Sequence, residues 1–574
     1  MIACWIVQAI AGSQFVCPDG ISYIEMAQSA NRGNWRELIN AYWSPAYPTL
    51  VAGWLAVLRP SRHYEILAVN CLNVVLLVMA LWSFEYLMSG IAALQQRFAD
   101  EDVEALPMEK WPVRGLLYVV FFCIATWFTP AGLATPDALV FAFFLLASGM
   151  VVRMYCGEYG MPRFLWLGGI LGFAYLSKTA MFPIAFVFLA VAAFAGTFAG
   201  KGWTRILLSG SVSLLSFLLV SGPFIAALSA KKGRVTYGDV GAIAYAEMVN
   251  GIKKGIHWQG GPEGSGVPRH PTRKLFESPP VYEFAAPVGG SYPPWSDPSY
   301  WYEGVRPRFH LREQLRTLKA SADRCFEIYF GQTVCVTACF ALLLCWSAQP
   351  RLFVAEFWRL KFFWLPAVSG LALFALVYVE ERYIAGFVLV LWLAAVVALR
   401  FRKIPENGNV NQAIALAVAI LLLAQIAWPF SNTARLAASR PGFSALEMAN
   451  YLNAQGVKPG GKVAEVGDAL YDHIWAHLAG VTITAEVPQE GVMDFWSASP
   501  ETRRRVLDLF TQAGASIVVA KVVPDGKEAE GWKKVGDTYY YALDLRARTH
   551  SAQGSKTPAG EATVGSAPGA FLSN

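Results

Sequence analysis

The sequence predicts an α-helical polytopic membrane protein with a small C-terminal α/β domain. Of its 574 residues, 55% are hydrophobic and only 15% are charged, whereas soluble domains carry about 25% charged residues. Apolar segments long enough to cross a bilayer recur as far as residue 430. From residue 431 the pattern changes to short strands and helices in alternation, which is typical of a small α/β domain.

We expect about eleven membrane spans, because a span needs roughly 20 apolar residues. The predicted spans cover residues 1–16, 64–88, 115–130, 136–152, 164–178, 180–199, 204–228, 328–347, 361–379, 383–400 and 411–430. The first is short and has no basic residue before it, so it does not resemble a signal peptide. We interpret it as a span whose start can lie upstream of Met1.

The first outer loop is expected to contain two amphipathic juxtamembrane helices, at residues 20–36 and 49–58. The second follows the segment Ser44-Pro-Ala-Tyr-Pro48 and ends at Arg59-Pro60. It is too short to span a bilayer, so it should lie flat on the membrane or re-enter it.

The positions of the basic residues predict which turns face the cytoplasm. Thirteen Lys and Arg residues fall in the turns after every second span, namely Arg97, Lys110, Arg114, Arg153, Arg163, Lys201, Arg205, Arg351, Arg359, Lys361, Arg400, Arg402 and Lys403. The positive-inside rule makes these the cytoplasmic turns of a plasma-membrane protein. Asp19 and Asp137 then lie at the outer face. The net charge of +6 indicates contact with anionic membrane lipids rather than nucleic acid.

A long outer loop is expected at residues 230–327. Its middle, residues 258–310, is rich in Gly, Pro and aromatic side chains. Because disordered loops contain few aromatics, we expect this part to pack over the membrane domain. Trp258 and Trp301 could then contact a substrate, or they could anchor the loop at the membrane interface.

The chain divides into three predicted parts. The membrane domain covers residues 1–430 and the α/β domain residues 431–548. The tail at 549–574 has few large apolar residues, which predicts disorder. Because the α/β domain follows an odd number of spans, it should lie on the outer side. Within it we expect strands at 463–467, 481–486, 515–522, 532–535 and 539–545, and helices at 468–479 and 503–513.

Ionisable residues at the outer ends of spans are the candidates for chemistry, because a charge at a membrane edge usually serves a function. Asp19 and Asp137 stand near the starts of expected helices, and helix capping is the competing interpretation for both. Lys178 lies between two apolar runs and could simply extend to the interface. The turn at residues 380–383 has the sequence Glu-Glu-Arg-Tyr, which is often a solvated ion pair. The shared outer location of Asp19, Asp137, Lys178 and this turn favours one common site.

His473 and His477 are four residues apart on an expected helix, which is the spacing of a metal-binding pair. Ile474 follows the first histidine, so the sequence is not the His-Glu-x-x-His motif. A surface helix without metal is the favoured interpretation. We therefore assign no metal ligands.

Five short motifs at these places together resemble a known superfamily. They are Pro18-Asp19-Gly-Ile-Ser-Tyr-Ile-Glu-Met-Ala27, Ser44-Pro-Ala-Tyr-Pro48, Thr135-Pro-Asp-Ala-Leu139, Tyr175-Leu-Ser-Lys178 and Glu381-Arg-Tyr383. Their order, spacing and common outer location resemble the GT-C superfamily of integral-membrane glycosyltransferases. They are most similar to the bacterial group related to protein O-mannosyltransferases (glycosyltransferase family 39) and the lipid A aminoarabinose transferase. The resemblance covers about residues 1–430.

The resemblance implies a polyprenyl-phosphate-linked sugar donor, transfer on the extracytoplasmic side, and roles for particular residues. The family's first-loop catalytic aspartate corresponds to Asp19, which would take a proton from the acceptor. Its Pro-Asp residue corresponds to Asp137, which would orient the acceptor or the base. Its lysine after the fifth span corresponds to Lys178, which with Arg382 would bind the donor phosphate. Further candidates for contacting the substrates are Glu381, Tyr383, Trp258 and Trp301.

Two features depart from the family pattern. The first outer loop contains no Asp-x-Asp or Glu-x-Asp pair, so a divalent cation would have no obvious ligands there, and no cofactor is assigned. Residues 258–310 match no family motif, so the acceptor can be a glycan, a lipid or a protein.

Three other functions remain in competition. A polysaccharide polymerase or ligase that uses a polyprenyl-diphosphate glycan would also place arginines on a large outer loop, as this sequence does at Arg269, Arg273, Arg306 and Arg308. A transporter of lipid-linked sugars would carry charges deep within spans and show two related halves, which this sequence does not. A membrane anchor with a C-terminal docking module would leave the outer charged cluster without a role.

Overall fold

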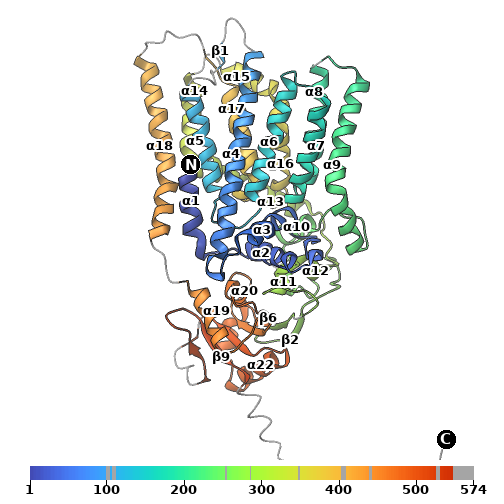
Figure 1. Cartoon of the computed structure of the whole chain (residues 1–574), viewed down its shortest axis with the longest axis vertical. Coiled ribbons are helices and arrows are strands. Elements are labelled where there is room, and N and C mark those ends of the chain that lie inside the picture. Colours follow the sequence, from blue (N-terminus) through green and yellow to red (C-terminus); the bar gives the residue numbers. More distant parts are fainter. Residues whose placement is uncertain are drawn as a thin grey trace, which may run out of the picture.

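The computed structural model is a bundle of long helices with a layer of short helices over one end, and a sheet-containing domain lies beyond that layer (Figure 1). The structure describes residues 1–97, 104–105, 111–198, 200–252, 255–284, 286–346, 350–401, 409–438, 443–521, 523–524 and 530–546. The tail expected to be disordered, residues 549–574, lies outside this part of the chain.

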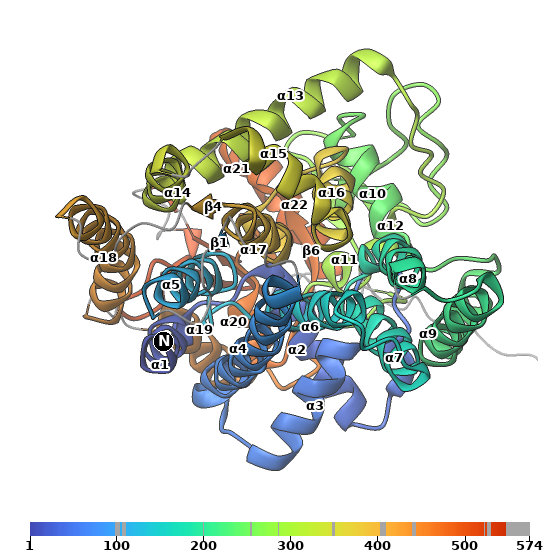
Figure 2. The same ribbon diagram turned by 90° about the horizontal axis from the view of Figure 1, so that it is seen from above.

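A helix occupies each range that was expected to span the membrane. In chain order the bundle helices are α1 (Ile2–Ala11), α4 (Glu65–Arg97), α5 (Trp111–Trp127), α6 (Asp137–Tyr155), α7 (Met161–Ser177), α8 (Met181–Phe198), α9 (Trp203–Lys232), α14 (Val334–Trp346), α16 (Lys361–Ala375), α17 (Glu381–Val397) and α18 (Asn409–Ala438). Seen along the bundle, α4, α6 and α17 lie near its centre and α9 and α18 at its edge (Figure 2).

The lengths of these helices confirm a multi-span membrane protein. Among the described residues, five helices are long and apolar enough to cross a membrane, namely Arg62–Gln95, Asp137–Tyr155, Met181–Phe198, Trp203–Lys232 and Leu416–Arg435. A sixth is added if Leu311–Gln332 and Val334–Cys345, bent by 79°, form one span. The other bundle helices have 17 residues or fewer, which is at or below the lower end of the range of about 17–25 residues that spans a bilayer. The full count of eleven therefore stays a prediction.

The layer over the bundle end comes from two segments far apart in the sequence. It contains α2 (Pro18–Asn31) and α3 (Ala46–Leu58) from the first loop, and α10 (Val240–Met248), α11 (Pro293–Ser296) and α12 (Pro298–Trp301) from the second. The helix expected at residues 20–36 ends at Asn31. Two residues later, Gly33 takes a φ of +92°, a backbone conformation that residues with a side chain rarely adopt. Next to this layer, α13 (Leu311–Glu327) crosses the bundle end before the chain turns into α14.

The C-terminal domain is built on a seven-stranded mixed sheet in the order β2-β3-β6-β5-β7-β9-β8. The strands are β2 (Arg273–Phe276), β3 (Val281–Glu283), β5 (Lys462–Val466), β6 (Thr482–Val487), β7 (Ile517–Ala520), β8 (Lys533–Lys534) and β9 (Tyr541–Asp544). Only β6, β5 and β7 run parallel. The domain's helices are α19 (Ser444–Ala454), α20 (Ile474–Ala479), α21 (Val492–Ser497) and α22 (Pro500–Gln512). The expected strand and helix order is thus confirmed, although the helix expected at 468–479 begins only at Ile474.

Two strands of this sheet come from the outer loop and not from the C-terminal part of the chain. β3 pairs antiparallel with β6, with Tyr282 opposite Glu486, so the sheet crosses the domain border expected at residue 430. The aromatic segment at 258–310 therefore does pack, as its composition predicted.

The remaining elements connect these layers. They are β1 (Glu104–Ala105) paired with β4 (Arg400–Phe401), α15 (Pro350–Arg359), the 3₁₀ turns Gly12–Gln14, Trp35–Leu38, Arg62–Tyr64, Gly255–His257 and Gln489–Gly491, and the π-helical turn Ile328–Gln332.

Candidate active site

Four helix ends bring the expected site residues together under the layer of short helices. Asp19 lies in the first turn of α2, and Asp137 is the first residue of α6. Lys178 directly follows α7, which runs antiparallel to α6 and so ends where α6 begins. Arg382 lies in the first turn of α17. The N-cap positions of α2 and α6 fall on Cys17 and Pro136, so neither aspartate is the capping residue.

The charged side chains form one alternating network. Lys178 Nζ lies 2.5 Å from Asp137 Oδ1. Arg382 Nη1 lies 3.8 Å from Asp137 Oδ2, and its Nη2 lies 3.0 Å from Asp19 Oδ2. A third carboxylate, of Glu380, accepts a hydrogen bond from Arg382 Nε at 2.7 Å. Such charge-assisted contacts between partly buried groups hold each side chain in one orientation.

Tyr383 adds an aromatic surface to this network. Lys178 Nζ lies 3.6 Å and Arg382 Cζ 4.8 Å from the centre of its ring, within the range of cation–π interactions. Its hydroxyl accepts a hydrogen bond from Arg382 Nη2 at 3.0 Å. The two cations are therefore fixed against one ring and lie close to each other, as binding of a single anion would require.

The network opens into a large cavity of about 1470 Å³. Pockets for one small molecule occupy about 300–1,000 Å³, so this cavity has room for more than one substrate. Its lining includes Asp19, Asp137, Lys178, Arg382 and Tyr383. Helix ends of the bundle form one wall of the cavity and the second outer loop forms another.

Comparison with known proteins identifies this architecture. No protein-family model matches the chain, and no curated protein matches its sequence. Among solved structures, ArnT from Cupriavidus metallidurans bound to undecaprenyl phosphate superimposes with a TM-score of 0.53 at 11% identity, over 95% of this chain and 96% of ArnT. The apo state of the same enzyme gives 0.52 at 12% identity, over the same shares. The chain has the GT-C fold. The fold that the resemblance of the five motifs implies is thereby confirmed.

Three expected site residues lie outside the cavity lining. The Glu381 carboxylate is hydrogen bonded by Gln332 Nε2 at 2.5 Å and pairs with Arg324, so it joins α13 to α17. Trp258 and Trp301 are 5% and 4% exposed. Both rings are buried, so neither presents an open face to a sugar ring.

Other aromatic side chains do reach the cavity. Tyr42, Trp43 and Trp295 line it together, with ring centres of Tyr42 and Trp43 4.6 Å apart and those of Trp43 and Trp295 5.6 Å apart. Tyr42 and Trp43 come directly before the Ser44-Pro-Ala-Tyr-Pro48 motif. That proximity was the only sequence signal for them.

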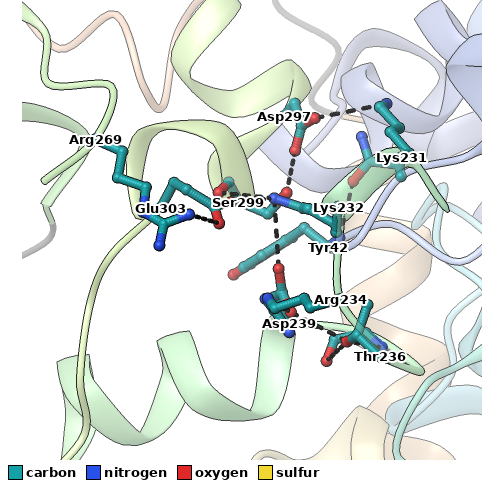
Figure 3. Close-up of polar contacts among 12 residues, drawn as sticks. Tyr42, Lys231, Lys232, Arg234, Thr236, Asp239, Arg269, Asp297, Ser299 and Glu303 are labelled. Carbon is teal, nitrogen blue, oxygen red and sulfur yellow. Dashed lines mark hydrogen bonds and ion pairs between the residues drawn. The ribbon is translucent and has the colours of Figure 1, made fainter. Parts of the chain in front are cut away.

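A second charged network, of which the sequence analysis named only Arg269, forms the loop side of the cavity (Figure 3). Lys232 Nζ lies 2.7 Å from Glu303 Oε2 and 3.4 Å from Asp239 Oδ2. Arg234 Nη2 lies 2.6 Å from Asp239 Oδ1, and Arg269 Nη1 lies 3.7 Å from Glu303 Oε1. The network joins the end of α9 to the start of α10 and to the turn after α12. The sequence does contain a signal for this network. Lys232 and Arg234 are basic residues at the outer end of a span, where the positive-inside rule predicts few of them.

The two histidines do not form a metal site. His473 Nδ1 bonds to the carbonyl oxygens of Ala469 and Leu470. His477 contacts Glu25 and Glu65 instead. The surface-helix interpretation is also wrong. Helix α20 packs between α19 and α2, and both histidine side chains are therefore buried. No group of three or more metal-binding side chains occurs in the described residues, and we derive no step through a metal.

Proposed function

We propose that this chain is a glycosyltransferase that moves a sugar from a polyprenyl-phosphate-linked donor to an acceptor on the extracytoplasmic face of the plasma membrane. The observation that carries the proposal is the network of Asp19, Arg382, Asp137 and Lys178 at the bundle end. A lipid phosphate anchored in the bilayer would arrive at this level. The likeness to a structure that contains undecaprenyl phosphate supports this choice of donor.

In this mechanism the acceptor needs activation by a base, whereas the leaving group needs little assistance from an acid. A polyprenyl phosphate leaves readily, but a hydroxyl or amine acceptor is a weak nucleophile. Asp19 takes the acceptor's proton while the acceptor oxygen or nitrogen attacks the anomeric carbon. The bond from that carbon to the phosphate oxygen breaks, and its electron pair stays on the phosphate. Lys178 and Arg382 offset the growing charge. One displacement inverts the anomeric centre.

The ion pairs of the site connect donor binding to this step. Arg382 pairs with Asp19 at 3.0 Å and Lys178 pairs with Asp137 at 2.5 Å. A donor phosphate would compete for both cations and weaken their hold on the carboxylates. Asp19 would then become a better base only when the donor is bound, and Asp137, which is 3% exposed, would orient Asp19 or the acceptor.

A second candidate function is supported by the arginines of the outer loop. Arg269 and Arg306 line the cavity, and a polymerase or ligase with a polyprenyl-diphosphate donor would use such cations for the second phosphate. Arg273 instead pairs with Glu283 at 2.6 Å, away from the cavity.

A lipid extract analysed by mass spectrometry tests the proposal. The strains are wild type, a deletion of the gene, and the deletion complemented with wild-type or Asp19→Asn protein. We expect one polyprenyl-monophosphate sugar to accumulate in the deletion and in the Asp19→Asn strain, and to return to normal with the wild-type protein. Accumulation of diphosphate-linked oligosaccharides would favour the polymerase or ligase instead. Unchanged lipids in a strain without redundant enzymes would refute both.

The proposed orientation makes a separate prediction. A reporter that is active only in the cytoplasm, fused after Leu545, is expected to be silent, because the C-terminal domain lies at the bundle end that carries Asp19 and Asp137. The matched control is the same reporter fused after Glu158, in the turn between α6 and α7 at the other end, which should be active. The reverse pattern would place the site in the cytoplasm and contradict a polyprenyl-linked donor used outside.

A further inference from the structure

The C-terminal domain contributes directly to the wall of the cavity. Leu470 and Tyr471, which follow β5, line it together with the membrane-domain residues described above. Leu470 is 9% exposed, whereas Tyr471 is 51% exposed, so about half of the Tyr471 surface is not covered by the described part of the chain. Among the described residues, the C-terminal domain supplies these two to the cavity lining.

The loop that carries Tyr471 occupies a special place in the sheet. β5 lies between β6 and β7, and all three strands are parallel. The chain leaves β5 toward β6 on one side, then crosses to β7 on the other side. In open α/β sheets, ligands bind outside the carboxyl ends of the strands where the strand order reverses in this way. Here residues 467–472 follow the carboxyl end of β5, and Lys521 follows that of β7.

Buried polar contacts hold this loop in one conformation. Asp472 accepts hydrogen bonds from Tyr540 Oη at 2.7 and 2.9 Å, and its Oδ2 lies 2.8 Å from Lys521 Nζ. From the other side, the His473 ring bonds to the carbonyl oxygens of residues 469 and 470 at 2.8 and 3.1 Å. Tyr471 thus projects from a braced loop, and a side chain positioned in advance binds a ligand at a lower entropic cost.

The braced loop and the proposed base Asp19 line the same cavity. α20, which begins two residues after Asp472, packs on α2, the helix that carries Asp19. The domain itself lies beyond the layer of short helices, on the far side from the bundle (Figure 1). A donor held by its lipid tail reaches the cavity from the bundle side, so the wall formed by the C-terminal domain faces the other substrate.

We propose that Tyr471 is a specificity-determining residue for the acceptor, and that its ring packs against the apolar face of an acceptor sugar. This inference rests on the proposed glycosyltransferase function and specifies its acceptor as a glycan or glycolipid. Asp472, Lys521 and Tyr540 are positioning residues that hold the loop. Aromatic rings offer large, rigid contact area at low entropic cost, and a sugar presents a face of C–H groups that can pack on such a ring.

The test uses full-length protein in nanodiscs and measures transfer at varied acceptor and donor. Labelled lipid extract of the deletion strain serves as donor, and unlabelled membranes of that strain serve as the titrated acceptor. The donor that these membranes contain is measured by mass spectrometry and counted in the donor concentration. We expect Tyr471→Ala to raise the half-saturating amount of acceptor membranes about tenfold, with the half-saturating donor and the maximal rate within about twofold. Tyr471→Phe keeps the ring and should stay near wild type. Tyr64→Ala is the matched control, because Tyr64 is 57% exposed and lies outside the cavity lining.

Each contrary result has a distinct meaning. An equal shift in donor saturation would assign Tyr471 to the donor and overturn the inference. A Tyr471→Phe protein as impaired as Tyr471→Ala would show that the hydroxyl matters and not the ring, and would also overturn it. A Tyr471→Ala protein identical to wild type would do the same. Wild-type protein that transfers no label, while it still binds undecaprenyl phosphate, would refute the proposed function itself.

Discussion

Purified Asp19→Asn protein is expected to transfer sugar about 10²–10⁴-fold more slowly than wild type, which is the range that general-base catalysis contributes. Asparagine keeps the size of the side chain and can still bond to Arg382, so the fold should persist. It cannot accept the acceptor's proton. The measurement is the initial rate of label transfer at saturating donor and acceptor.

Binding of the donor lipid should not weaken in the Asp19→Asn protein. In wild type the Asp19 carboxylate lies 3.0 Å from Arg382 Nη2 and competes with a phosphate for that guanidinium. Removing its charge should leave undecaprenyl phosphate binding unchanged or make it tighter. A loss of transfer without a loss of binding distinguishes a catalytic base from a group that only holds the site together.

Asp508→Asn provides the matched control. Asp508 is exposed on α22 and does not line the cavity, so its substitution should leave the rate within about twofold of wild type. Full transfer activity in the Asp19→Asn protein would remove Asp19 from its proposed role.

The convergence of Asp19, Asp137, Lys178 and Arg382 could be predicted from the sequence, and the structure places all four in one network. Each lies at the end of an apolar segment, and the alternation of spans decides which ends share a side. The apolar segments and the charges at their ends are local features that recur along the chain. The side assigned to one span therefore constrains the side assigned to the next.

The sequence analysis did not predict the surroundings of Trp258, Trp301 and His477. These surroundings depend on contacts between segments that are far apart in the sequence. Composition showed that the loop containing Trp258 and Trp301 would pack, but not which of its rings would be covered. β3 contains only three residues and pairs with β6 about two hundred positions later, which no local pattern reveals. The spacing of His473 and His477 describes one helix face, whereas the partners of His477 belong to α2 and α4.

The contact of His477 with these two helices predicts a second large effect, on stability. His477 Nδ1 lies 3.1 Å from Glu25 Oε1, and its Nε2 lies 3.0 Å from Glu65 Oε2. The imidazole is 4% exposed and the carboxylates 14% and 13%. His477→Gln would leave two buried carboxylates close together without their cation, which costs about 3–5 kcal/mol. We expect a clearly lower Tm in detergent and faster release of the C-terminal domain by protease.

A variant that removes the whole charge cluster separates this effect from lost packing. His477→Gln combined with Glu25→Gln and Glu65→Gln leaves no unpaired charge, so it should be more stable than His477→Gln alone. If the triple variant is the less stable of the two, the contact stabilises the interface by shape and hydrogen bonding, and the electrostatic argument fails.

The pH dependence gives an independent check with a definite sign. Burial alone would lower the pKa of His477, but the two carboxylates raise it from its ordinary 6.5 to about 10. A pKa that is higher in the folded state stabilises the fold fully below pH 6.5, and this contribution is lost as the pH rises toward 10. His477 also lowers the pKa of Glu25 below its ordinary 4.5, against the effect of burial, so that contribution is lost in acid. Tm should therefore be highest between about pH 4.5 and 6.5, and His477→Gln should remove the decline on the alkaline side. An equal alkaline decline in both proteins would show that other groups titrate there and that His477 is not the proton-linked contact between the two domains.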